Sequence, residues 1–345
     1  MVNNNTDKQY FELINHILKN GVKKLDRTGT GTISVFDYTM RFNMDEGFPL
    51  LTSKKMFTKG IIHELIWFLS GDTNIKYLLD NGVGIWTGDA YKRYRSVPKD
   101  NMCDGDLEFL SASHAYEDYY SEEDFVEMIK SDDDFAKKWG ELGPVYGKQW
   151  RNWNGIDQIS NLINDLKNNP DSRRLMVSAW NPSELENQVL PPCHYVFQCY
   201  TQEMELNERV RRWCKSLDKD ILYGDDMTHE KLDNVGFPKR KLSLKFNMRS
   251  IDSGLGLPFN IASYALLLHL LSREVNMIPC DLIFSGGDCH IYLNHVIEIE
   301  KQLNNETFKL PNIELYNKSI YDLKFDDIKI LNYKSSASVK MALSN

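Results

Sequence analysis

The sequence predicts an α/β protein that consists of one domain with two insertions. Segments with apolar residues at helical spacing alternate with short runs of β-branched and aromatic residues, which are typical of strands. No internal repeat and no clear linker divides the 345 residues. Residues 95–138 and 203–240 are rich in charged side chains and are predicted as insertions at the surface.

Eleven elements account for most of the remaining chain. Apolar spacing predicts helices over residues 9–20, 59–70, 74–81, 157–168, about 261–276 and 294–304. Runs of β-branched, aromatic or alternating apolar residues predict strands over residues 33–42, 175–180, 195–200, 241–248 and 282–284. The glycines at 286 and 287 predict a loop over residues 285–292.

The two insertions differ in charge. The first is acidic, and we expect a solvated face with a helix over residues 122–130 and no chemistry of its own. The second contains nearly equal numbers of acidic and basic residues and is expected to lengthen the connection between strands 195–200 and 241–248. Because the acidic residues concentrate in the first insertion, the rest of the chain is close to neutral.

Composition excludes several classes of protein. The 42% hydrophobic content is sufficient for a sizeable core, and a net charge of −8 argues against a general nucleic-acid binder. The six cysteines have no metal-ligand spacing, so we expect free thiols and no metal. The polar N-terminus does not resemble a secretory signal, and no apolar run reaches the length of a membrane span. We therefore expect a cytoplasmic enzyme, of a cell or of a phage within its host.

Two segments that contain arginine could bind an anion. Asp26–Thr32 combines Arg27 with two glycines and three threonines, which suits phosphate oxygens, although a plain turn is the better interpretation of this segment alone. Arg173 and Arg174 precede a predicted strand and would form either an anion site or an ordinary surface pair.

Glu64 lies inside a strongly apolar predicted helix. Burial of a carboxylate is costly, so Glu64 either faces a polar cavity, has a partner, or lies exposed on the helix edge. Desolvation would raise its pKa and allow it to transfer protons near neutrality.

Cys193 follows two prolines and precedes a predicted strand. Proline restricts φ and removes a backbone donor, so the chain before Cys193 forms a stiff turn. A rigid lead-in suits a nucleophile that must meet a substrate carbon at a fixed angle, whereas a lone half-buried thiol would be the ordinary interpretation.

These segments occur in the order of a known family. The chain resembles the thymidylate synthase family over nearly its full length, apart from the two insertions. The matching segments are Asp26–Thr32, His63–Gly71, Gly143–Trp150, Asp171–Asn181, Leu190–His194, Arg249–Asp252, Leu255–Tyr264 and Gly286–Tyr292. The resemblance implies a large mixed β-sheet flanked by helices, and a homodimer in which the sheets of two subunits pack against each other.

The resemblance also implies a substrate and a covalent reaction. Cys193 resembles the nucleophile that adds to C6 of dUMP, after which C5 attacks the methylene of 5,10-methylenetetrahydrofolate. A shared phosphate site would take ligands from both subunits. The residues implied at the phosphate are Arg27, Arg249 and Ser250 of one subunit and Arg173 and Arg174 of the other. Arg249 would also favour the thiolate of Cys193.

The remaining roles follow the same resemblance. Asn260 resembles the residue that recognises the uracil edge, because an amide can donate to O4 and accept from N3–H. The other substrate residues implied are Gln198 and, at the ribose, His290 and Tyr292. The residues implied in proton and water transfer are Glu64, Tyr146, His194 and Asp252, and those implied at the folate are Trp86, Asp252 and the terminal Asn345.

The chain departs from the family pattern mainly on the folate side. Thr87 and Asp89 follow Trp86 where the family has an acidic residue and then Trp or Asn, and Met248 replaces a glutamine. The tail ends in Leu343-Ser344-Asn345 instead of a short apolar tripeptide.

The sequence is compatible with two final steps of the reaction, which give different products. A closed, dry site would let the folate deliver hydride and give dTMP, whereas an ordered water would give 5-hydroxymethyl-dUMP. We expect dTMP, with the hydroxymethylase as the alternative. A non-catalytic nucleotide- or RNA-binding relative is a distant third, because Cys193, Glu64, Asp252 and Asn260 are all present.

Overall fold

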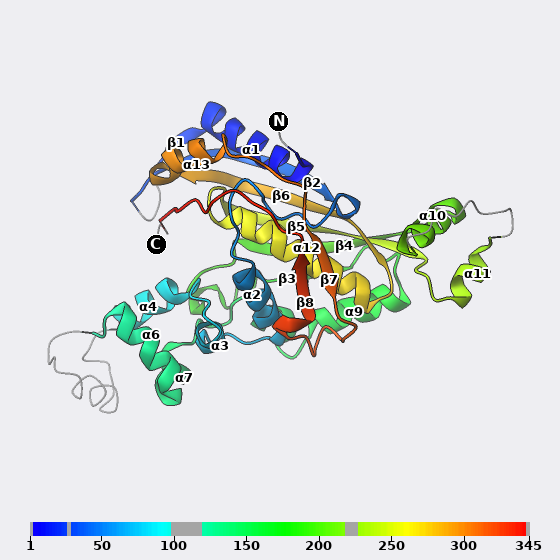
Figure 1. The fold of residues 1–345 in the computed structure, drawn as a ribbon. Helices are drawn as coiled ribbons and strands as arrows, with labels where there is room; N and C mark the ends of the chain where they lie inside the picture. Colours follow the sequence, from blue (N-terminus) through cyan, green and yellow to red (C-terminus); the bar gives the residue numbers. More distant parts are fainter. Residues whose placement is uncertain (1–2, 26–28, 98–118, 218–226, 343–345) are drawn as a thin grey trace. The chain divides into compact units, whose positions relative to one another are not determined.

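The computed structural model describes residues 3–25, 29–97, 119–217 and 227–342 (Figure 1). The chain forms two compact units, which we describe separately. The sheet unit contains residues 1–58, 157–178 and 193–344, and the helical unit contains residues 59–156 and 179–192. No helix in the described part of the chain has both the length and the apolar content needed to cross a membrane.

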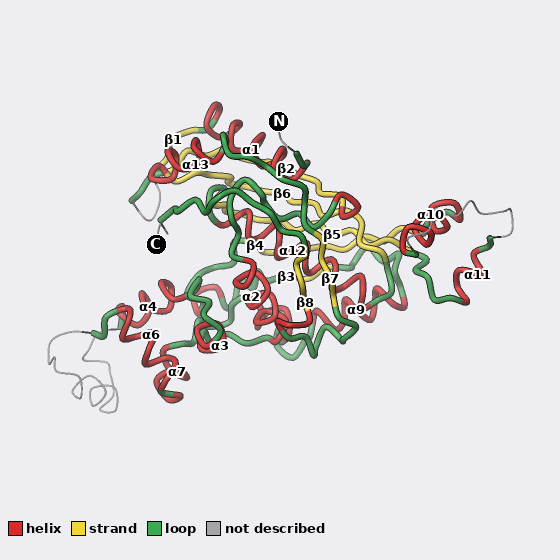
Figure 2. Tube along the Cα trace, in the orientation of Figure 1, coloured by secondary structure: helices red, strands yellow, loops and turns green. Residues whose placement is uncertain are grey.

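The sheet unit is built on a six-stranded mixed sheet in the order β1-β2-β6-β5-β4-β3 (Figures 1 and 2). Its strands are β1 (Val22–Lys24), β2 (Thr32–Asn43), β3 (Met176–Ser178), β4 (His194–Glu203), β5 (Arg240–Asp252) and β6 (Ile278–Tyr292). β5 and β6 are parallel and the other neighbouring pairs are antiparallel. The predicted mixed α/β fold is therefore confirmed, and the second insertion does connect two adjacent strands.

Helices and a hairpin complete the sheet unit. They are α1 (Asn5–Asn20), α9 (Gln158–Asn168), α10 (Leu206–Ser216), α11 (His229–Asn234), α12 (Gly256–Glu274), α13 (Val296–Gln302), β7 (Asn312–Leu315) and β8 (Ile328–Leu331). α12 packs on β5 and β6, and α1 packs on β2 and β6. Among the described residues, this unit also has 3-10 helices at Met44–Glu46, Leu293–His295 and Phe325–Asp327, and the helical unit has one at Leu185–Asn187.

The core lies on one face of the sheet, where strand register aligns apolar residues. The residues of one such row are Val177, Phe197, Phe246, Phe284 and Met40, and all five are buried. The ring of Phe246 stacks on Tyr264 of α12, with centroids 4.3 Å apart and planes 10° apart. This stacking holds the N-terminal half of α12, which contains Asn260, against the sheet.

The opposite face of the sheet is much more open. The adjacent row of register partners is Met176, Gln198, Lys245, Ile283 and Arg41, and all of them are exposed or half-buried. Tyr200 of β4 is 69% exposed, and Phe36 of β2 is 84% exposed. Large apolar side chains in such positions mark a surface available for association.

The predicted loop over residues 285–292 is wrong, because β6 continues through it to Tyr292. The strand pairs with β2 on one side and β5 on the other, so its backbone groups are satisfied in the sheet. Gly287 marks a close approach to β5, because a Cβ there would lie 3.0 Å from the carbonyl oxygen of Arg249. Glycine within a strand thus reflects packing here and not a turn.

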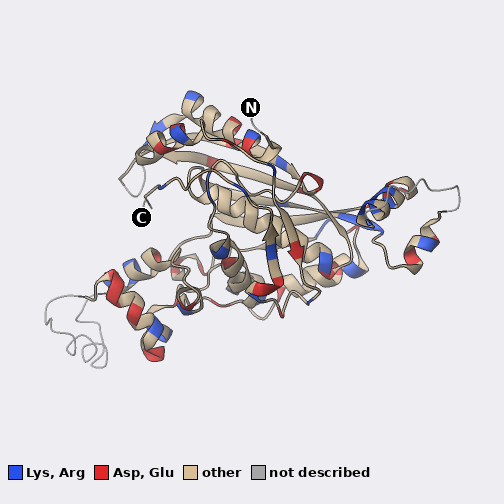
Figure 3. Cartoon of the chain, viewed as in Figure 1, with Lys and Arg blue, Asp and Glu red and all other residues tan. Residues whose placement is uncertain are grey.

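The helical unit contains α2 (Thr58–Ser70), α3 (Lys76–Asp80), α4 (Thr87–Ser96), α6 (Glu122–Ser131), α7 (Asp133–Trp139) and α8 (Tyr146–Arg151). The helix expected over residues 122–130 is confirmed as α6. The first insertion is more than a solvated face, however, because Phe125 and Phe135 pack with the flanking residues Tyr94 and Trp139 in a small aromatic core. Tyr94, Phe125, Phe135 and Trp139 are buried, and the ring centroids of Tyr94 and Trp139 are 5.1 Å apart. Acidic residues occupy the first turns of α6 and α7 (Figure 3).

The second insertion is organised by one buried arginine. Arg209 of α10 is 1% exposed and donates to Asp233 Oδ1 at 2.9 Å and to the carbonyls of Phe237 and Pro238 at 2.9 and 3.1 Å. Arg212, one turn later, forms a bidentate pair with Asp45, with both distances 2.8 Å. These contacts connect α10 with α11 and with Asp45, and so hold the described part of the insertion on the sheet unit.

We expect Arg209→Ala to weaken the second insertion, because the change leaves Asp233 and two carbonyls without their donor. The local free energy of opening of α10 and α11 should fall by about 2–4 kcal/mol, measured by native-state hydrogen exchange. Arg211, exposed on the same helix, supplies the control, and Arg211→Ala should change the value by less than about 0.5 kcal/mol. Equal protection in both variants would contradict this role for Arg209.

Candidate active site

The predicted site residues divide between the two units. Arg27 and Asn345 lie outside the described residues. The helical unit holds Glu64, Trp86 and Tyr146. The sheet unit holds Arg173, Arg174, Cys193, His194, Gln198, Arg249, Ser250, Asp252, Asn260, His290 and Tyr292.

Cys193 immediately precedes β4, at the end of the Pro191-Pro192 turn, so the predicted position at a strand entrance is confirmed. Its side chain is half-buried and forms no disulfide. The backbone N–H of Arg249 donates to the carbonyl oxygen of Cys193 at 2.9 Å, which makes the two residues neighbours on β4 and β5.

His194 is held neutral by burial. Its Nδ1 lies 2.8 Å from the hydroxyl of Tyr264, and the two rings meet edge to face. Burial lowers the pKa of His194 to about 3, because the charged imidazolium would lose its hydration. A neutral imidazole next to the cysteine can hold and orient a water or a hydroxyl without adding charge. The sequence assigned no role to Tyr264, although this residue fixes the ring.

Asn260 lies in the first turns of α12, beside β5. The helix begins at Gly256, so Asn260 does not cap it, and its amide is available for another partner. The Nδ2 atom is 3.8 Å from the sulfur of Met248, the residue that departs from the family pattern. A thioether is a weak acceptor, so this contact leaves most of the hydrogen-bonding capacity of the amide unused.

Asp252 ends β5 and anchors the turn into α12. Its Oδ1 accepts from the backbone N–H groups of Gly254 and Leu255, both at 3.0 Å. Two further groups near this turn were not singled out by the sequence. Lys54 is buried and donates to the carbonyl oxygen of Gly254 at 2.7 Å, and burial lowers its pKa to about 8. The Nδ1 of His295 lies 3.9 Å from Asp252 Oδ1.

His290 and Tyr292 lie at the end of β6, where the sequence predicted a loop. Their rings meet edge to face with centroids 5.2 Å apart. His290 Nδ1 is 3.1 Å from Asp288 Oδ1, and Asp288 also pairs with Lys24. The carboxylate therefore orients the imidazole and leaves Nε2 for a ligand.

The described tail lies along the sheet unit. Ser336 N–H donates to the carbonyl of Thr52 at 2.8 Å, and His295 Nε2 lies 2.6 Å from the carbonyl oxygen of Ala342. His295 is fully buried, so it acts as a fixed point for the last described residues.

Arg173 and Arg174 do not join the Cys193–Arg249 pair within one chain. They form an exposed bend ahead of β3, and Cys199 N–H donates to the carbonyl of Leu175, the next residue along. Gln198 Nε2 donates to the carbonyl of Arg173 at 3.5 Å. The bend thus lies roughly seven residues along β4 from Cys193, which corresponds to about 20 Å of strand.

The three residues of the helical unit are close together. Trp86 Nε1 donates to Glu64 Oε1 at 2.9 Å, and the rings of Trp86 and Tyr146 meet edge to face with centroids 6.1 Å apart. Tyr146 and Trp86 are both buried. α8 can approach α2 closely because residue 147 is glycine, where a Cβ would lie 2.7 Å from the carbonyl of Phe68.

Glu64 has the environment of a proton-transfer group. Desolvation by the surrounding protein raises the pKa of its carboxyl to about 7, and the hydrogen bond from Trp86 opposes the shift. The alternatives left by the sequence are thereby resolved, since Glu64 is half-buried and has a partner. A carboxyl with a pKa near 7 can both give and take a proton at neutral pH.

Comparison with known proteins supplies the family. The family profile described as thymidylate synthase matches residues 8–345. A thymidylate synthase of Mesoplasma florum is 44% identical over 333 residues, which cover 96% of this chain and 98% of the relative. That of Mycoplasma genitalium is 42% identical, with 94% and 96% covered, and that of Listeria monocytogenes is 41% identical, with 98% and 99% covered.

We expect Glu64→Gln to flatten the dependence of stability on pH. Because folding raises the pKa of Glu64, its contribution to stability is complete below about pH 4.5 and is lost as the pH rises through 7. The free energy of unfolding is measured in urea at pH 5 and at pH 8. Its decrease between these two pH values should be about 2 kcal/mol smaller in the variant than in the wild type. Glu123→Gln, at an exposed glutamate of α6, should leave the slope unchanged. An unaltered slope in Glu64→Gln would show that the carboxyl is not desolvated.

Proposed function

The chain belongs to the thymidylate synthase family, and we infer from this membership how its residues methylate dUMP to dTMP. The relatives compared above, at 41–44% identity, all carry the name thymidylate synthase. These names favour hydride transfer, which gives dTMP, over addition of water, which gives 5-hydroxymethyl-dUMP. The sequence left both products open. The observation that supports the residue assignments is the backbone bond between Arg249 and Cys193, which makes the proposed phosphate ligand and the proposed nucleophile neighbours across two strands.

Cys193 is the proposed nucleophile. Its thiolate adds to C6 of the uracil ring, so that a C–S bond forms and electron density moves to C5 and O4. The stiff turn before β4 holds Sγ in a fixed direction, and Arg249 stabilises the thiolate before attack. The adduct turns C5 into a carbon nucleophile, and the C–S bond breaks again when the product leaves.

Four residues are proposed to manage protons and water during these steps. Glu64 has the pKa required to exchange a proton with the base at neutral pH, and Tyr146 lies in the same aromatic cluster. His194, neutral and fixed by Tyr264, orients polar hydrogens near the cysteine. Asp252 accepts hydrogen bonds at the turn into α12.

The nucleotide is proposed to lie along β5, β6 and the start of α12. Asn260 would recognise the uracil edge, since its amide offers one donor and one acceptor. His290 and Tyr292 would bind the ribose hydroxyl, while Arg27, Arg249 and Ser250 would bind the phosphate. Gln198 is kept as a proposed substrate residue from the family resemblance, and its Nε2 donates to the carbonyl of Arg173.

The proposed co-substrate is 5,10-methylenetetrahydrofolate. Asp252 suits it, because its side chain is half-buried, keeps acceptor capacity beyond the bonds at Oδ1, and can meet N–H donors of a pterin. Trp86 is kept as a proposed folate residue from the family resemblance, although its ring is buried here. When bound, the folate would supply the one-carbon unit and then the hydride. Asn345, which lies outside the described residues, is kept as a proposed folate-binding residue from the family resemblance.

A homodimer with a shared phosphate site explains the position of Arg173 and Arg174. An arginine side chain cannot cover the roughly 20 Å of β4 that lies between the bend and Cys193. The open face of the sheet, with Phe36 and Tyr200 exposed, supplies a surface on which a second copy can pack. We propose that each subunit donates Arg173 and Arg174 to the phosphate bound by its partner.

Two broader predictions from the sequence are retained in this proposal. Both units belong to one thymidylate synthase-like domain with two insertions, because the family profile spans nearly the whole chain. The enzyme acts in the cytoplasm on small molecules, without membrane or nucleic-acid partners.

Cys193→Ser is expected to abolish turnover while dUMP still binds, because the phosphate and base contacts do not involve Sγ. The rate should fall on the order of 10³-fold or more, measured as dihydrofolate absorbance with dUMP and methylenetetrahydrofolate as substrates. Isothermal titration should give a Kd for dUMP close to that of the wild type.

Cys199→Ser supplies the matched control, since Cys199 is a buried thiol on the same strand. It should retain turnover. Mass spectrometry of the wild-type product should show one dTMP for each dihydrofolate. A hydroxymethylated nucleotide formed without dihydrofolate would contradict the assigned reaction.

Mixing two inactive variants tests the shared site. We expect Cys193→Ser and the double variant Arg173→Ala/Arg174→Ala to be inactive alone, because each lacks one half of every site. After subunit exchange, about half of the dimers are mixed and each holds one complete site, so about one quarter of wild-type activity should return. Absence of recovery, with mixed dimers demonstrated by mass spectrometry, would rule out sharing.

A further inference from the structure

We propose that Arg240, the first residue of β5, is a positioning residue that keeps Arg173 and Arg174 available for the phosphate of dUMP. The inference rests on the proposed function of that arginine pair. It comes from a group of contacts at the end of the sheet opposite to Cys193, where the second insertion rejoins β5. Three residues carry it, namely Arg240, Asp171 and Thr201.

The bend that presents the arginines is short and is held at both ends. After the bend, Leu175 begins the pairing of β3 with β4 through its carbonyl bond to Cys199 N–H, at 2.8 Å. Before the bend, the hydroxyl of Thr201 donates to the carbonyl of Pro170 at 2.7 Å. Thr201 is buried on β4, so this bond ties the start of the bend to the sheet.

Arg240 bonds both to Thr201 and to Asp171, the residue that follows Pro170. Its Nε donates to Thr201 Oγ1 at 3.0 Å, and its Nη2 forms an ion pair with Asp171 Oδ1. A hydroxyl can donate one hydrogen bond and accept another, so Thr201 satisfies Pro170 and Arg240 at the same time. The guanidinium side chain is 17% exposed, whereas the Asp171 side chain is 75% exposed.

The charge of Asp171 explains why this anchor matters. The carboxylate lies two residues before Arg173 and three before Arg174, on an exposed bend. Without another partner it would compete with the phosphate for these guanidiniums and would repel a dianion. Arg240 engages the carboxylate and turns it toward β5. The two arginines then remain directed outward, as a phosphate dianion requires.

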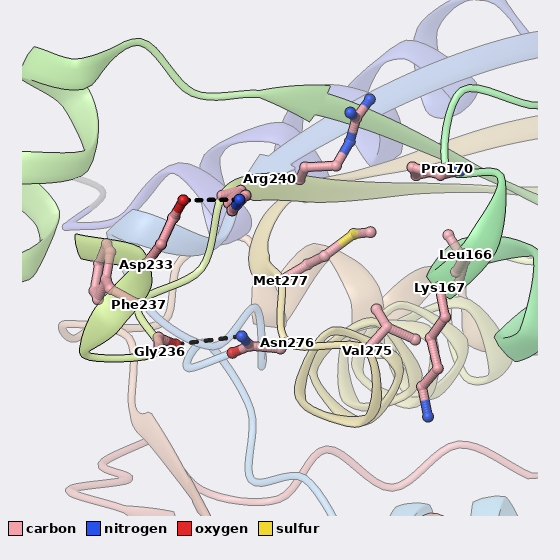
Figure 4. A pocket seen from close by; sticks show the side chains of 11 residues that line it. Leu166, Lys167, Pro170, Asp233, Gly236, Phe237, Arg240, Val275, Asn276 and Met277 are labelled. Atoms are coloured by element: carbon pink, nitrogen blue, oxygen red, sulfur yellow. Dashed lines mark hydrogen bonds and ion pairs between the residues drawn. The ribbon is translucent and has the colours of Figure 1, made fainter. Parts of the chain in front are cut away.

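Arg240 also lines a pocket of about 440 Å³ between α9, α11 and the C-terminal end of α12 (Figure 4). The other cations around this pocket have different acidic partners. Lys239 pairs with Asp233 at 2.8 Å, and Lys167 pairs with Glu274 at 3.4 Å. Lys239 is therefore a suitable control, since it neighbours Arg240 and lines the same pocket without contacting the bend.

The test is a double-mutant cycle in the intact enzyme, read as KM for dUMP and kcat at saturating methylenetetrahydrofolate. Arg240→Ala should raise KM by about threefold to fivefold and leave kcat within about twofold. Asp171→Asn should leave KM near the wild-type value, because the competing charge is gone. In the Arg240→Ala/Asp171→Asn double variant, KM should return to within about twofold of wild type.

Competition by inorganic phosphate gives a second measurement. The inhibition constant of phosphate against dUMP should rise in Arg240→Ala in parallel with KM and should recover in the double variant. Arg240→Lys retains a cation for Asp171 and should retain KM, and Lys239→Ala should match wild type. A purely structural role for Arg240 would instead lower kcat or stability in every background.

Three results would be decisive. The positioning role is overturned if KM for dUMP is unchanged in Arg240→Ala. It is also overturned if Arg240→Ala raises KM by the same factor in the wild-type and the Asp171→Asn backgrounds. Arg174→Ala separates this failure from failure of the proposed function, since it should raise KM at least tenfold if the arginine binds phosphate. If Arg174→Ala has no effect, the phosphate role of the pair fails and the inference falls with it.

Discussion

The antiparallel pairing of β4 with β5 is the constraint on which the site depends. The same ladder places Arg249 beside Cys193 at one end and Arg240 opposite Glu203 at the other, from where the Arg240 side chain reaches Thr201. Because backbone pairing fixes the register residue by residue, it decides both which side chains meet and which stay apart. The separation of Arg173 from Cys193 along β4 follows in the same way from the pairing of β3 with β4, and it is the reason that the proposed phosphate site needs a second subunit.

Burial acts on the titratable groups of the site in opposite directions. Desolvation raises the pKa of the Glu64 carboxyl to about 7 and lowers that of the His194 imidazole to about 3. Both shifts keep the group neutral where its charged form would be poorly solvated. The carboxyl can therefore exchange protons near neutrality, while the imidazole remains a fixed, uncharged hydrogen-bonding group. Desolvation thus gives Glu64 and His194 different chemical properties.

The two insertions were harder to interpret than the conserved-looking motifs around them. Their charged composition predicted surface excursions, which describes the outside of α6 and α7 well. It gave no sign that Tyr94, Phe125 and Trp139 would pack into a small core, because the aromatic residues are widely spaced in the sequence. Arg209 is a similar case, since a buried arginine depends on acceptors supplied by a different helix and loop.

The sequence by itself determined the local chemistry of this protein. The proline turn before Cys193, the apolar period of α2 around Glu64 and the order of the motifs all follow from neighbouring residues. Tertiary structure alone decided that Gly286 and Gly287 lie inside a strand, that Tyr264 holds His194, and that Arg240 reaches Asp171. The physical reason is that backbone restriction and periodicity act over a few residues. Register, desolvation and ion pairing, by contrast, arise between segments that are distant in the chain.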